Sequence, residues 1–289
     1  MTPRDVFWTA IEERMNNDSR YIILTGDMGA PALDNIRRRF PHRFRNCGCS
    51  EQAMVDIAVG WALEGYWPII FGITPFVTSR CYEQIKMAAI MGVSVAIVGV
   101  GAGLGYADAG PTHHGADDYN IMRIIPGMTV YTPSSTSMVK YCARQVGKGL
   151  VYIRLDREEL PEIHYNPITL DSIPDIDELF KEGIWVHRKG KRYIISHGYM
   201  VHRALKVAEK FGWGVVEIFR HPWDDTVLFG DDFCVLEENY SAGGLWSAVL
   251  EKINQTEKDC ITSWGTREEL HKRLKMGEGD IEVWLQESD

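Results

Sequence analysis

The 289-residue sequence lacks both an excess of basic charge and a long apolar run. Its 31 Lys and Arg residues are outnumbered by 40 Asp and Glu residues, which gives a formal net charge of −9. A general nucleic-acid binder needs a basic face that neutralises phosphates, and a membrane-spanning helix needs roughly 20 apolar residues. The first residues, Met1 to Asp5, also lack the basic and then hydrophobic segments of a secretion signal. We therefore expect a cytoplasmic protein that binds neither nucleic acid nor membranes.

Cysteine is present, but without any pattern. The six cysteines stand at positions 47, 49, 81, 142, 234 and 260, with no CxxC pair and no regular framework. Such scattered thiols fit a reducing compartment. Hydrophobic residues make up 45% of the chain and charged residues 25%, the profile of a globular protein. At roughly 150 residues per domain, the length allows one large or two ordinary domains.

Nucleotide-binding and lipase-type motifs are also missing. A glycine-rich loop, residues 99–115, follows the apolar run 93–100, but a GxGxxG motif would need glycine where Leu104 or Tyr106 stands. Pro111 interrupts any helix that could begin directly after the loop. No Gly-Lys-Ser, Gly-Lys-Thr or Gly-x-Ser-x-Gly sequence occurs. The loop therefore does not predict a dinucleotide, P-loop or lipase-type site.

The same loop is nevertheless a candidate active site. Loops at the carboxyl ends of parallel strands are where such sheets bind ligands. A structural turn is the alternative, and the two histidines among many glycines favour a site. The loop and the residues after it also carry four potential metal ligands, but adjacent histidines rarely face one ion, so we predict no metal centre here; the four are His113, His114, Asp117 and Asp118.

Apolar periodicity predicts two α/β domains. In the first half we expect strands at 21–25, 67–71, 93–100 and 150–154, and helices at 3–16, 32–40, 50–65, 82–90 and 136–147. In the second half we expect strands at 193–196, 214–218 and 233–237, and helices at 199–211, 243–254 and 266–274. Strands that are apolar on both faces indicate mostly parallel sheets covered by helices. Acidic residues and turn formers break the periodicity between them, so we predict domains at 1–157 and 183–289 joined by a linker at 158–182.

The segment 46–65 is the most informative helix. Ser50 is a good N-cap, and Glu51 follows in the first turn, where the helix dipole favours negative charge. Five apolar residues then recur at the spacing of a buried helix: Met54, Ile57, Ala58, Trp61 and Ala62. Small residues between them, such as Gly60, suggest close packing against another element. Glu51 has two interpretations at this point, as part of a structural cap or as a functional carboxylate.

Five segments in order resemble the pyrimidine-binding domain of transketolases. They are residues 49–54, 80–89, 110–113, 123–128 and 132–134. Residues 183–289 resemble the C-terminal domain that follows it in that family, through the segments 195–201 and 237–244. The resemblance covers nearly the whole chain, and five ordered motifs are more specific than any single one.

The resemblance implies a thiamine diphosphate site. Glu51 matches the glutamate that hydrogen-bonds N1′ of the aminopyrimidine, which is acid–base work by a positioned carboxylate. Phe76 is the candidate for the ring that stacks on the pyrimidine, and Phe71 is the alternative. Asp27 stands where the family has an aspartate near the cofactor and the dimer interface.

The resemblance also assigns substrate residues. His113 matches a catalytic loop histidine that contacts the donor sugar or the intermediate. Arg157 matches an arginine that binds the substrate phosphate, and a salt bridge in the linker is the rival interpretation. The family usually has aspartate directly before Gly-Pro-Thr-His, where this chain has Ala109, with Asp108 one place earlier. The sugar specificity therefore stays open.

The resemblance finally implies a partner subunit. In the family, Mg²⁺ and a Gly-Asp-Gly…Asn motif in a separate domain hold the diphosphate, and neither Gly26-Asp-Met nor Gly230-Asp-Asp continues that pattern. We expect an N-terminal-type subunit to carry the Mg²⁺ site, in an α2β2 assembly that transfers two-carbon ketol units between sugar phosphates. The alternatives are the β subunit of a 2-oxoacid or acetoin dehydrogenase, which would require a lipoyl carrier, and a non-catalytic scaffold.

Overall fold

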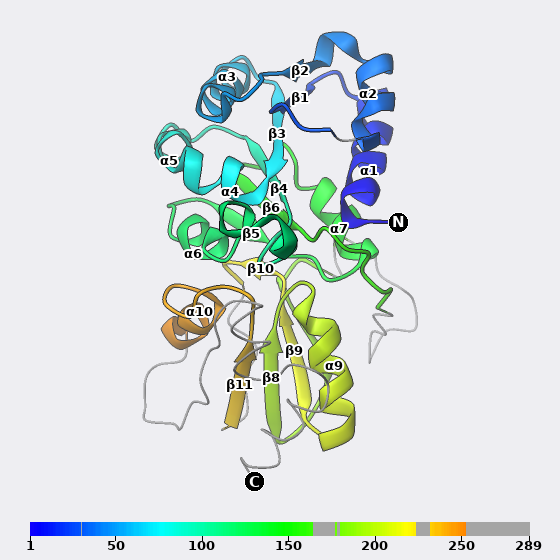
Figure 1. Ribbon diagram of the computed structural model, residues 1–289, viewed down its shortest axis with the longest axis vertical. Helices are drawn as coiled ribbons and strands as arrows, with labels where there is room; N and C mark the ends of the chain where they lie inside the picture. Colours follow the sequence, from blue (N-terminus) through cyan, green and yellow to red (C-terminus); the bar gives the residue numbers. More distant parts are fainter. Residues whose placement is uncertain (30, 164–176, 178–179, 224–231, 253–289) are drawn as a thin grey trace.

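The computed structural model describes residues 1–29, 31–163, 177, 180–223 and 232–252. Two sheets, each covered by helices, lie one above the other (Figure 1). The predicted α/β class with mostly parallel sheets is confirmed. The exact domain boundaries stay a prediction, because most of the linker 158–182 lies outside the described residues.

The first sheet has seven strands in the order β10-β5-β6-β4-β3-β1-β2. Its parallel strands are β1 Tyr21–Thr25, β2 Phe44–Asn46, β3 Trp67–Ile73, β4 Ala96–Val100, β5 Thr129–Tyr131 and β6 Val151–Leu155. The strand β10, Arg220–His221, joins the edge of this sheet antiparallel to β5. The four predicted strands are confirmed, although β4 starts three residues later than expected. The short strands β2 and β5 were not predicted.

Helices cover both faces of the first sheet. One layer contains α1 Pro3–Asn17, α2 Asp34–Arg39 and α7 Thr136–Ala143, and the other contains α3 Glu51–Leu63, α5 Tyr82–Ile90 and α6 Asp118–Arg123 (Figure 1). A four-residue helix, α4 Thr74–Val77, follows β3. Short 3-10 turns occur at Pro31–Leu33, Pro41–Arg43, Ser79–Cys81, Ala107–Ala109 and Pro111–His113. An apolar core lies under each helical layer, and the core under α3, α5 and α6 continues into the second sheet.

The second sheet has four strands in the order β11-β8-β9-β7. They are β7 Ile184–Arg188, β8 Arg192–Ser196, β9 Gly214–Ile218 and β11 Asp232–Leu236, with helices α9 Met200–Phe211 and α10 Leu245–Lys252. The strands β8, β9 and β11 are parallel, whereas β7 pairs antiparallel with β9. The three predicted strands are confirmed to within one residue, and β7 was missed. The helix expected at 266–274 lies outside the described residues.

Helix α3 differs from its prediction in two respects. Ser50 occupies the N-cap position, but its side chain makes no capping hydrogen bond. The predicted stripe is only partly buried, because Met54 and Ala58 are fully enclosed while Ile57 is 44% exposed. A Cβ added to Gly60 would meet no atom within 4 Å, so this glycine faces open space rather than a packed neighbour. One side of α3 therefore packs on the sheet, and the other leaves apolar side chains at the surface.

Two further observations concern the described residues only. None of their helices combines the length and the apolar character needed to span a membrane. The five cysteines among them are free thiols.

Candidate active site

A pocket of about 320 Å³ lies at the carboxyl ends of β1 and β3. Strand ends supply one wall, and the start of α3, the short helix α4 and the glycine-rich loop supply the rest. The lining residues are Gly26, Asp27, Met28, Cys49, Glu51, Phe71, Gly72, Ile73, Phe76, Arg80 and His113. Ligands bind at this edge of open parallel sheets, because the loops after the strands converge there.

Glu51 is the first residue of α3 and faces this pocket. Its side chain is 12% exposed, and its Oε1 accepts a hydrogen bond from Nη1 of Arg80 at 2.7 Å. The helix N-terminus favours the negative charge. The backbone after β1 passes close by, since a Cβ on Gly26 would lie 3.8 Å from Oε1 of Glu51. The carboxylate is thus held at the pocket wall by a cation and a helix terminus, and it makes no side-chain cap.

Phe76 and His113 are linked to Glu51 through a series of side-chain contacts that begins with Arg80. The guanidinium of Arg80 lies 4.1 Å from the ring centroid of Phe76. The ring of Phe76 lies 5.0 Å from the imidazole of His113, at an interplanar angle of 66°. A carboxylate, a cation, an aromatic ring and an imidazole therefore line one pocket in sequence. These residues come from α3, the turn before α5, α4 and the loop after β4.

Phe71 takes a different place. It is fully buried, and its ring packs edge-to-face on Trp8 of α1 at 5.1 Å. Its residue contributes to the pocket wall, but the ring belongs to the core beneath α1. Phe76 is half-buried and offers its ring to the pocket. Of the two predicted candidates, Phe76 is therefore the better placed to stack on a ligand.

Asp27 lies at the rim of the pocket. It is exposed, and its backbone N–H donates to the carbonyl of Gly48 at 3.2 Å. This bond ties the segment after β1 to the segment that leads into α3. The carboxylate of Asp27 is accessible to a ligand in the pocket or to a partner subunit.

Arg157 and Asp108 form an ion pair at 2.6 Å beside the pocket. The Arg157 guanidinium also lies 4.7 Å from the ring centroid of Tyr106, whose ring is 6.2 Å from that of His113. The salt-bridge interpretation of Arg157 is thus partly right, although its partner lies in the glycine-rich loop rather than in the linker. Both charges are exposed, so neither is committed to a buried structural role. Ala109 is exposed as well and adds no polar group.

The histidine–aspartate set after the glycine-rich loop does not gather around one point. Asp118 is fully buried and accepts hydrogen bonds from Arg154 at 2.7 and 2.8 Å. His113 instead faces Phe76 in the pocket. Within the described part of the chain, no group of three His, Cys, Asp or Glu side chains is arranged to hold a metal ion.

Sequence reasoning missed two members of the site. Arg80 was part of a recognised segment, but its pairing with Glu51 depends on how the chain turns between α4 and α5. Tyr106 was seen only as a residue that breaks a glycine motif. It links Arg157 to His113 through ring contacts.

The sheet order and the pocket define a mostly parallel α/β protein with a pocket at the carboxyl edge of its first sheet. Residues 1–162 match the family model described as "Transketolase, pyrimidine binding domain". The chain belongs to the transketolase family.

Two curated relatives are themselves single subunits of transketolases. The chain is 31% identical over 232 residues to a subunit of the apulose-4-phosphate transketolase of Actinobacillus succinogenes, covering 75% of this chain and 71% of that one. It is 28% identical over 302 residues to a 6-deoxy-6-sulfo-D-fructose transketolase subunit of a Clostridium species, covering 96% and 91%. These relatives favour the transketolase interpretation over a dehydrogenase β subunit.

Other relatives are single chains about twice as long. A 1-deoxy-D-xylulose-5-phosphate synthase of Salmonella newport is 28% identical over 305 residues, which cover 97% of this chain and 48% of that one. Among solved structures, a split-gene transketolase described as an inactive β4 tetramer superposes with a TM-score of 0.81 at 23% identity, over 99% of this chain and 97% of that one. The transketolase of Leishmania mexicana gives 0.78 at 17% identity, over 99% and 45%. These structural likenesses confirm the fold.

Proposed function

We propose that this chain is the pyrimidine-binding subunit of a split, thiamine-diphosphate-dependent transketolase. The observation that carries the proposal is the placement of Glu51 at the start of α3, in one pocket with Phe76 and His113. The two relatives that are themselves transketolase subunits support the reaction class. The reaction is the transfer of a two-carbon ketol unit between sugar phosphates.

The donor set of the pocket fits the aminopyrimidine half of the cofactor. Glu51 would hydrogen-bond N1′ and hold the proton there, and Phe76 would offer a ring to stack on. Asp27 at the rim would lie near the cofactor and the subunit interface. When bound, the cofactor supplies the carbanion chemistry of its thiazolium ring. Arg80 pairs with Oε1 of Glu51 and lies over the Phe76 ring, so a bound aminopyrimidine would compete with its guanidinium for these two side chains.

The residues beside the pocket fit a phosphorylated sugar. His113 would contact the donor or the intermediate, because it is the imidazole that faces Phe76. Arg157 would bind the substrate phosphate through its planar fork, for which Asp108 is the present partner. An exposed pair of this kind contributes little to stability, so exchanging the carboxylate for a phosphate costs little. Asp108 would then be free for a substrate hydroxyl.

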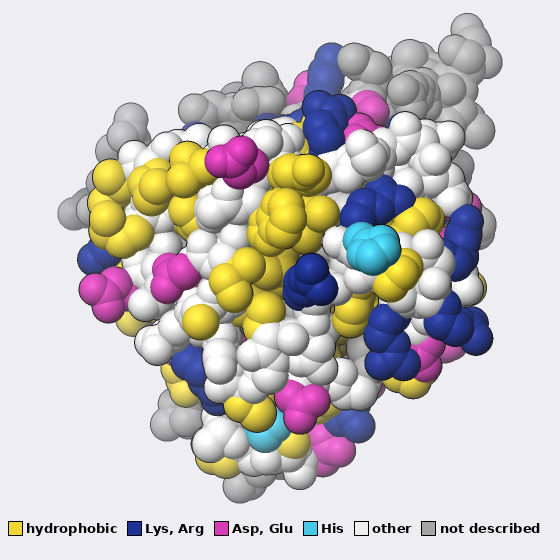
Figure 2. All heavy atoms as spheres, turned by 90° about the horizontal axis from the view of Figure 1, so that it is seen from above, with side chains coloured by type: hydrophobic (Ala, Val, Ile, Leu, Met, Phe, Trp, Pro, Cys, Tyr) yellow, Lys and Arg dark blue, Asp and Glu magenta, His cyan; other side chains and the backbone are white. Residues whose placement is uncertain are grey.

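An apolar surface next to the pocket fits the partner subunit. Five large hydrophobic side chains on α3, on α5 and just after α5 are exposed: Ile57 at 44%, Leu63 at 61%, Met87 at 48%, Ile90 at 70% and Met91 at 48%. Figure 2 views the end of the molecule where α3 lies and shows hydrophobic side chains gathered on this face. Exposed apolar patches of this kind mark interaction sites. We assign this apolar surface to the subunit that carries the diphosphate and Mg²⁺ ligands.

The stoichiometry follows from symmetry. Two copies of each subunit around a two-fold axis give an α2β2 heterotetramer, because closed symmetry is the usual outcome of assembly. Such obligate interfaces bury upwards of roughly 2,000 Å² and are core-like. We place this assembly in the cytoplasm, where free thiols persist.

Co-expression with a diphosphate-binding partner tests the proposal. The purified complex is assayed with ketose phosphate donors and, separately, with a 2-oxo acid plus a lipoyl carrier. We expect Mg²⁺- and thiamine-diphosphate-dependent ketol transfer from a sugar phosphate, and poor cofactor binding by the isolated chain. Turnover only with the 2-oxo acid and lipoyl carrier would support the dehydrogenase alternative. Micromolar, Mg²⁺-dependent binding to the isolated chain in calorimetry would contradict the split-enzyme proposal.

A further inference from the structure

The boundary between the two sheets contains a polar cluster that the proposed reaction does not use directly. It lies at the carboxyl ends of β8 and β11, the edge where a parallel sheet usually binds its ligands. Here that edge is filled by the base of the glycine-rich loop. The remaining cavity has a volume of about 20 Å³, room for about one water molecule and not for a substrate. The edge therefore contacts the first domain in place of a ligand.

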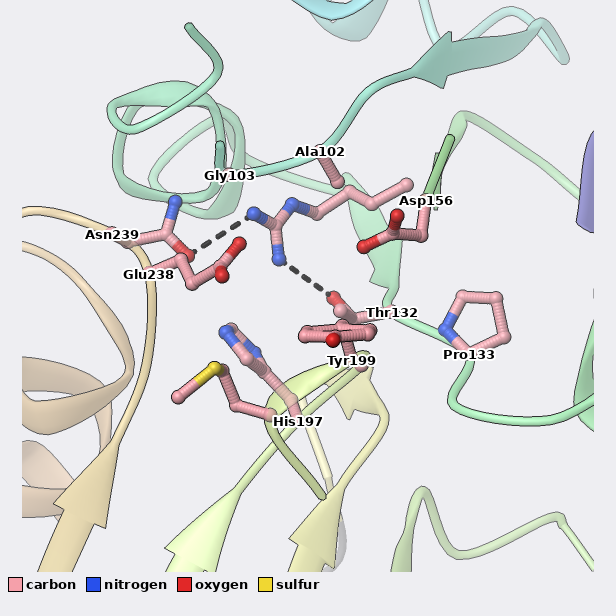
Figure 3. Close-up of a pocket in the computed structure, with 12 residues that line it drawn as sticks. Ala102, Gly103, Thr132, Pro133, Asp156, His197, Tyr199, Glu238 and Asn239 are labelled. Atoms are coloured by element: carbon pink, nitrogen blue, oxygen red, sulfur yellow. Dashed lines mark hydrogen bonds between the residues drawn. The ribbon is translucent and has the colours of Figure 1, made fainter. Parts of the chain in front are cut away.

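Glu238 binds the first half of the glycine-rich loop. Its Oε2 accepts a hydrogen bond from the backbone N–H of Leu104 at 3.2 Å. A Cβ on Gly103 would lie 2.5 Å from that oxygen and 2.8 Å from the Cβ of Glu238, so only glycine permits this approach. Gly103 also has a φ of +57°, which disfavours other residues. Figure 3 shows Glu238 and Asn239, from the connection after β11, beside Gly103.

Asn239 forms hydrogen bonds with the end of the glycine-rich loop and the residues directly after it. Its Nδ2 donates to the carbonyls of Gly115 and Ala116 at 3.4 and 3.2 Å, and to Oδ1 of Asp118 at 2.9 Å. Its Oδ1 accepts from Nη2 of Arg154 at 3.1 Å, one of the bonds drawn in Figure 3. Asn239 is fully buried, so each of these bonds replaces one to water.

The two parts of the loop that Glu238 and Asn239 contact are also hydrogen-bonded to each other. The N–H of Gly115 donates to the carbonyl of Gly103 at 2.7 Å, and both Ala102 and Gly103 form bridges with Gly115. His113 stands two residues before Gly115 and faces Phe76. A shift at Gly103 or Gly115 would therefore move the imidazole within the pocket.

From these contacts we infer that Glu238 and Asn239 are positioning residues: they hold the glycine-rich loop so that His113 points into the cofactor pocket. The second domain thereby takes part in the proposed reaction without contacting substrate. This inference rests on the proposed function for its kinetic consequence, but the bracing of the loop is a property of the chain itself. A positional error of about 1 Å at a reacting group can lower the rate on the order of a hundredfold.

The variants Glu238→Ala and Glu238→Gln test the contact between Glu238 and Leu104. Alanine removes the acceptor of the Leu104 N–H, whereas glutamine keeps an oxygen in its place. In the assembled complex we expect kcat to fall on the order of ten- to hundredfold with Glu238→Ala, with a smaller change in KM, and to recover largely with Glu238→Gln. The matched control is Glu251→Gln, which breaks a second contact between the domains, the pair with Arg123 at 2.7 Å, without touching the loop. It should leave kcat within about twofold.

A double-mutant cycle with His113→Ala separates positioning from a merely structural role. If Glu238 acts through His113, adding Glu238→Ala to His113→Ala lowers kcat little further. Additive losses would overturn the inference. Hydrogen exchange of residues 101–115 in the chain alone gives a readout that needs no activity: we expect faster exchange at Leu104 with Glu238→Ala and not with Glu251→Gln. Unchanged exchange would contradict the bracing, whereas an inactive wild-type complex would contradict the proposed function instead.

Discussion

Nη1 of Arg80 lies 2.7 Å from Oε1 of Glu51, and the same guanidinium covers the ring of Phe76 at 4.1 Å. Arg80 thus makes two contacts that an aminopyrimidine would make, a hydrogen bond to the carboxylate and a stack on the ring. The pair is partly exposed, with 46% of the Arg80 side chain accessible, so it contributes at most about 1 kcal/mol to stability. The site can therefore exchange this partner for another at little cost.

Replacing Glu51 by glutamine should abolish most turnover and leave the fold intact. Glutamine keeps the shape of the side chain but cannot hold the proton at N1′ as a carboxylate does. We expect kcat of the complex to fall at least about a hundredfold, with a melting temperature within about 2 °C of the wild type. Glu64→Gln, on the exposed C-cap of the same helix, is the matched control. Near-wild-type turnover with Glu51→Gln would return this residue to a structural role.

The two phenylalanines should separate binding from stability. Phe76→Ala removes the ring that faces the pocket, so we expect weaker cofactor binding by the complex and little change in the free energy of unfolding. Phe71→Ala removes a fully buried ring packed on Trp8 and should cost about 3–5 kcal/mol of stability. Calorimetric titration of the cofactor and denaturant unfolding measure the two effects. The opposite pattern would make Phe71 the stacking ring.

The sequence predicted the strands that are long and fully buried, and missed the short strands β2 and β5 as well as β7, where only Ile184 is buried. Strands such as β9, Gly214–Ile218, are continuous buried runs, whereas β2 and β5 have three residues each and too few positions for a periodic pattern. Glu51 and His113 are predicted as site residues through ordered family motifs, and both line the same pocket. The Glu238 contact to Leu104 could not be found in this way, since it joins residues 134 positions apart across two sheets. Such pairings depend on tertiary packing rather than on local sequence.

Acid should weaken the fold through His221. Burial, reinforced by the charge of Arg123, lowers the pKa of this imidazole to about 4 from its usual 6.5. Between those values the unfolded chain binds more protons than the folded one, so stability falls as the pH drops from 6.5 towards 4. After allowance for solvent screening, we expect the loss between pH 7 and 5 to be about 1 kcal/mol smaller in His221→Phe than in the wild type.

Denaturant unfolding at the two pH values measures this difference. The matched control is His42→Phe, which removes an imidazole at an exposed position on the first domain. An identical loss of stability in the wild type and in His221→Phe would show that His221 is protonated equally easily in both states.

Assembly should depend on the apolar surface formed by α3, α5 and Met91. Ile90, at the end of α5, is 70% exposed, so Ile90→Lys should change the stability of the chain by less than about 0.5 kcal/mol. A lysine there would have to be desolvated in the core of the subunit interface, and we expect the partner to bind at least tenfold more weakly. Ile124→Lys, at a residue 59% exposed just after α6, is the control for an equal change outside the proposed interface. Light scattering and titration of co-purified subunits measure the association. If Ile90→Lys assembled normally while Ile124→Lys did not, the partner would bind over α6 instead, and the apolar surface on α3 and α5 would lose its assignment.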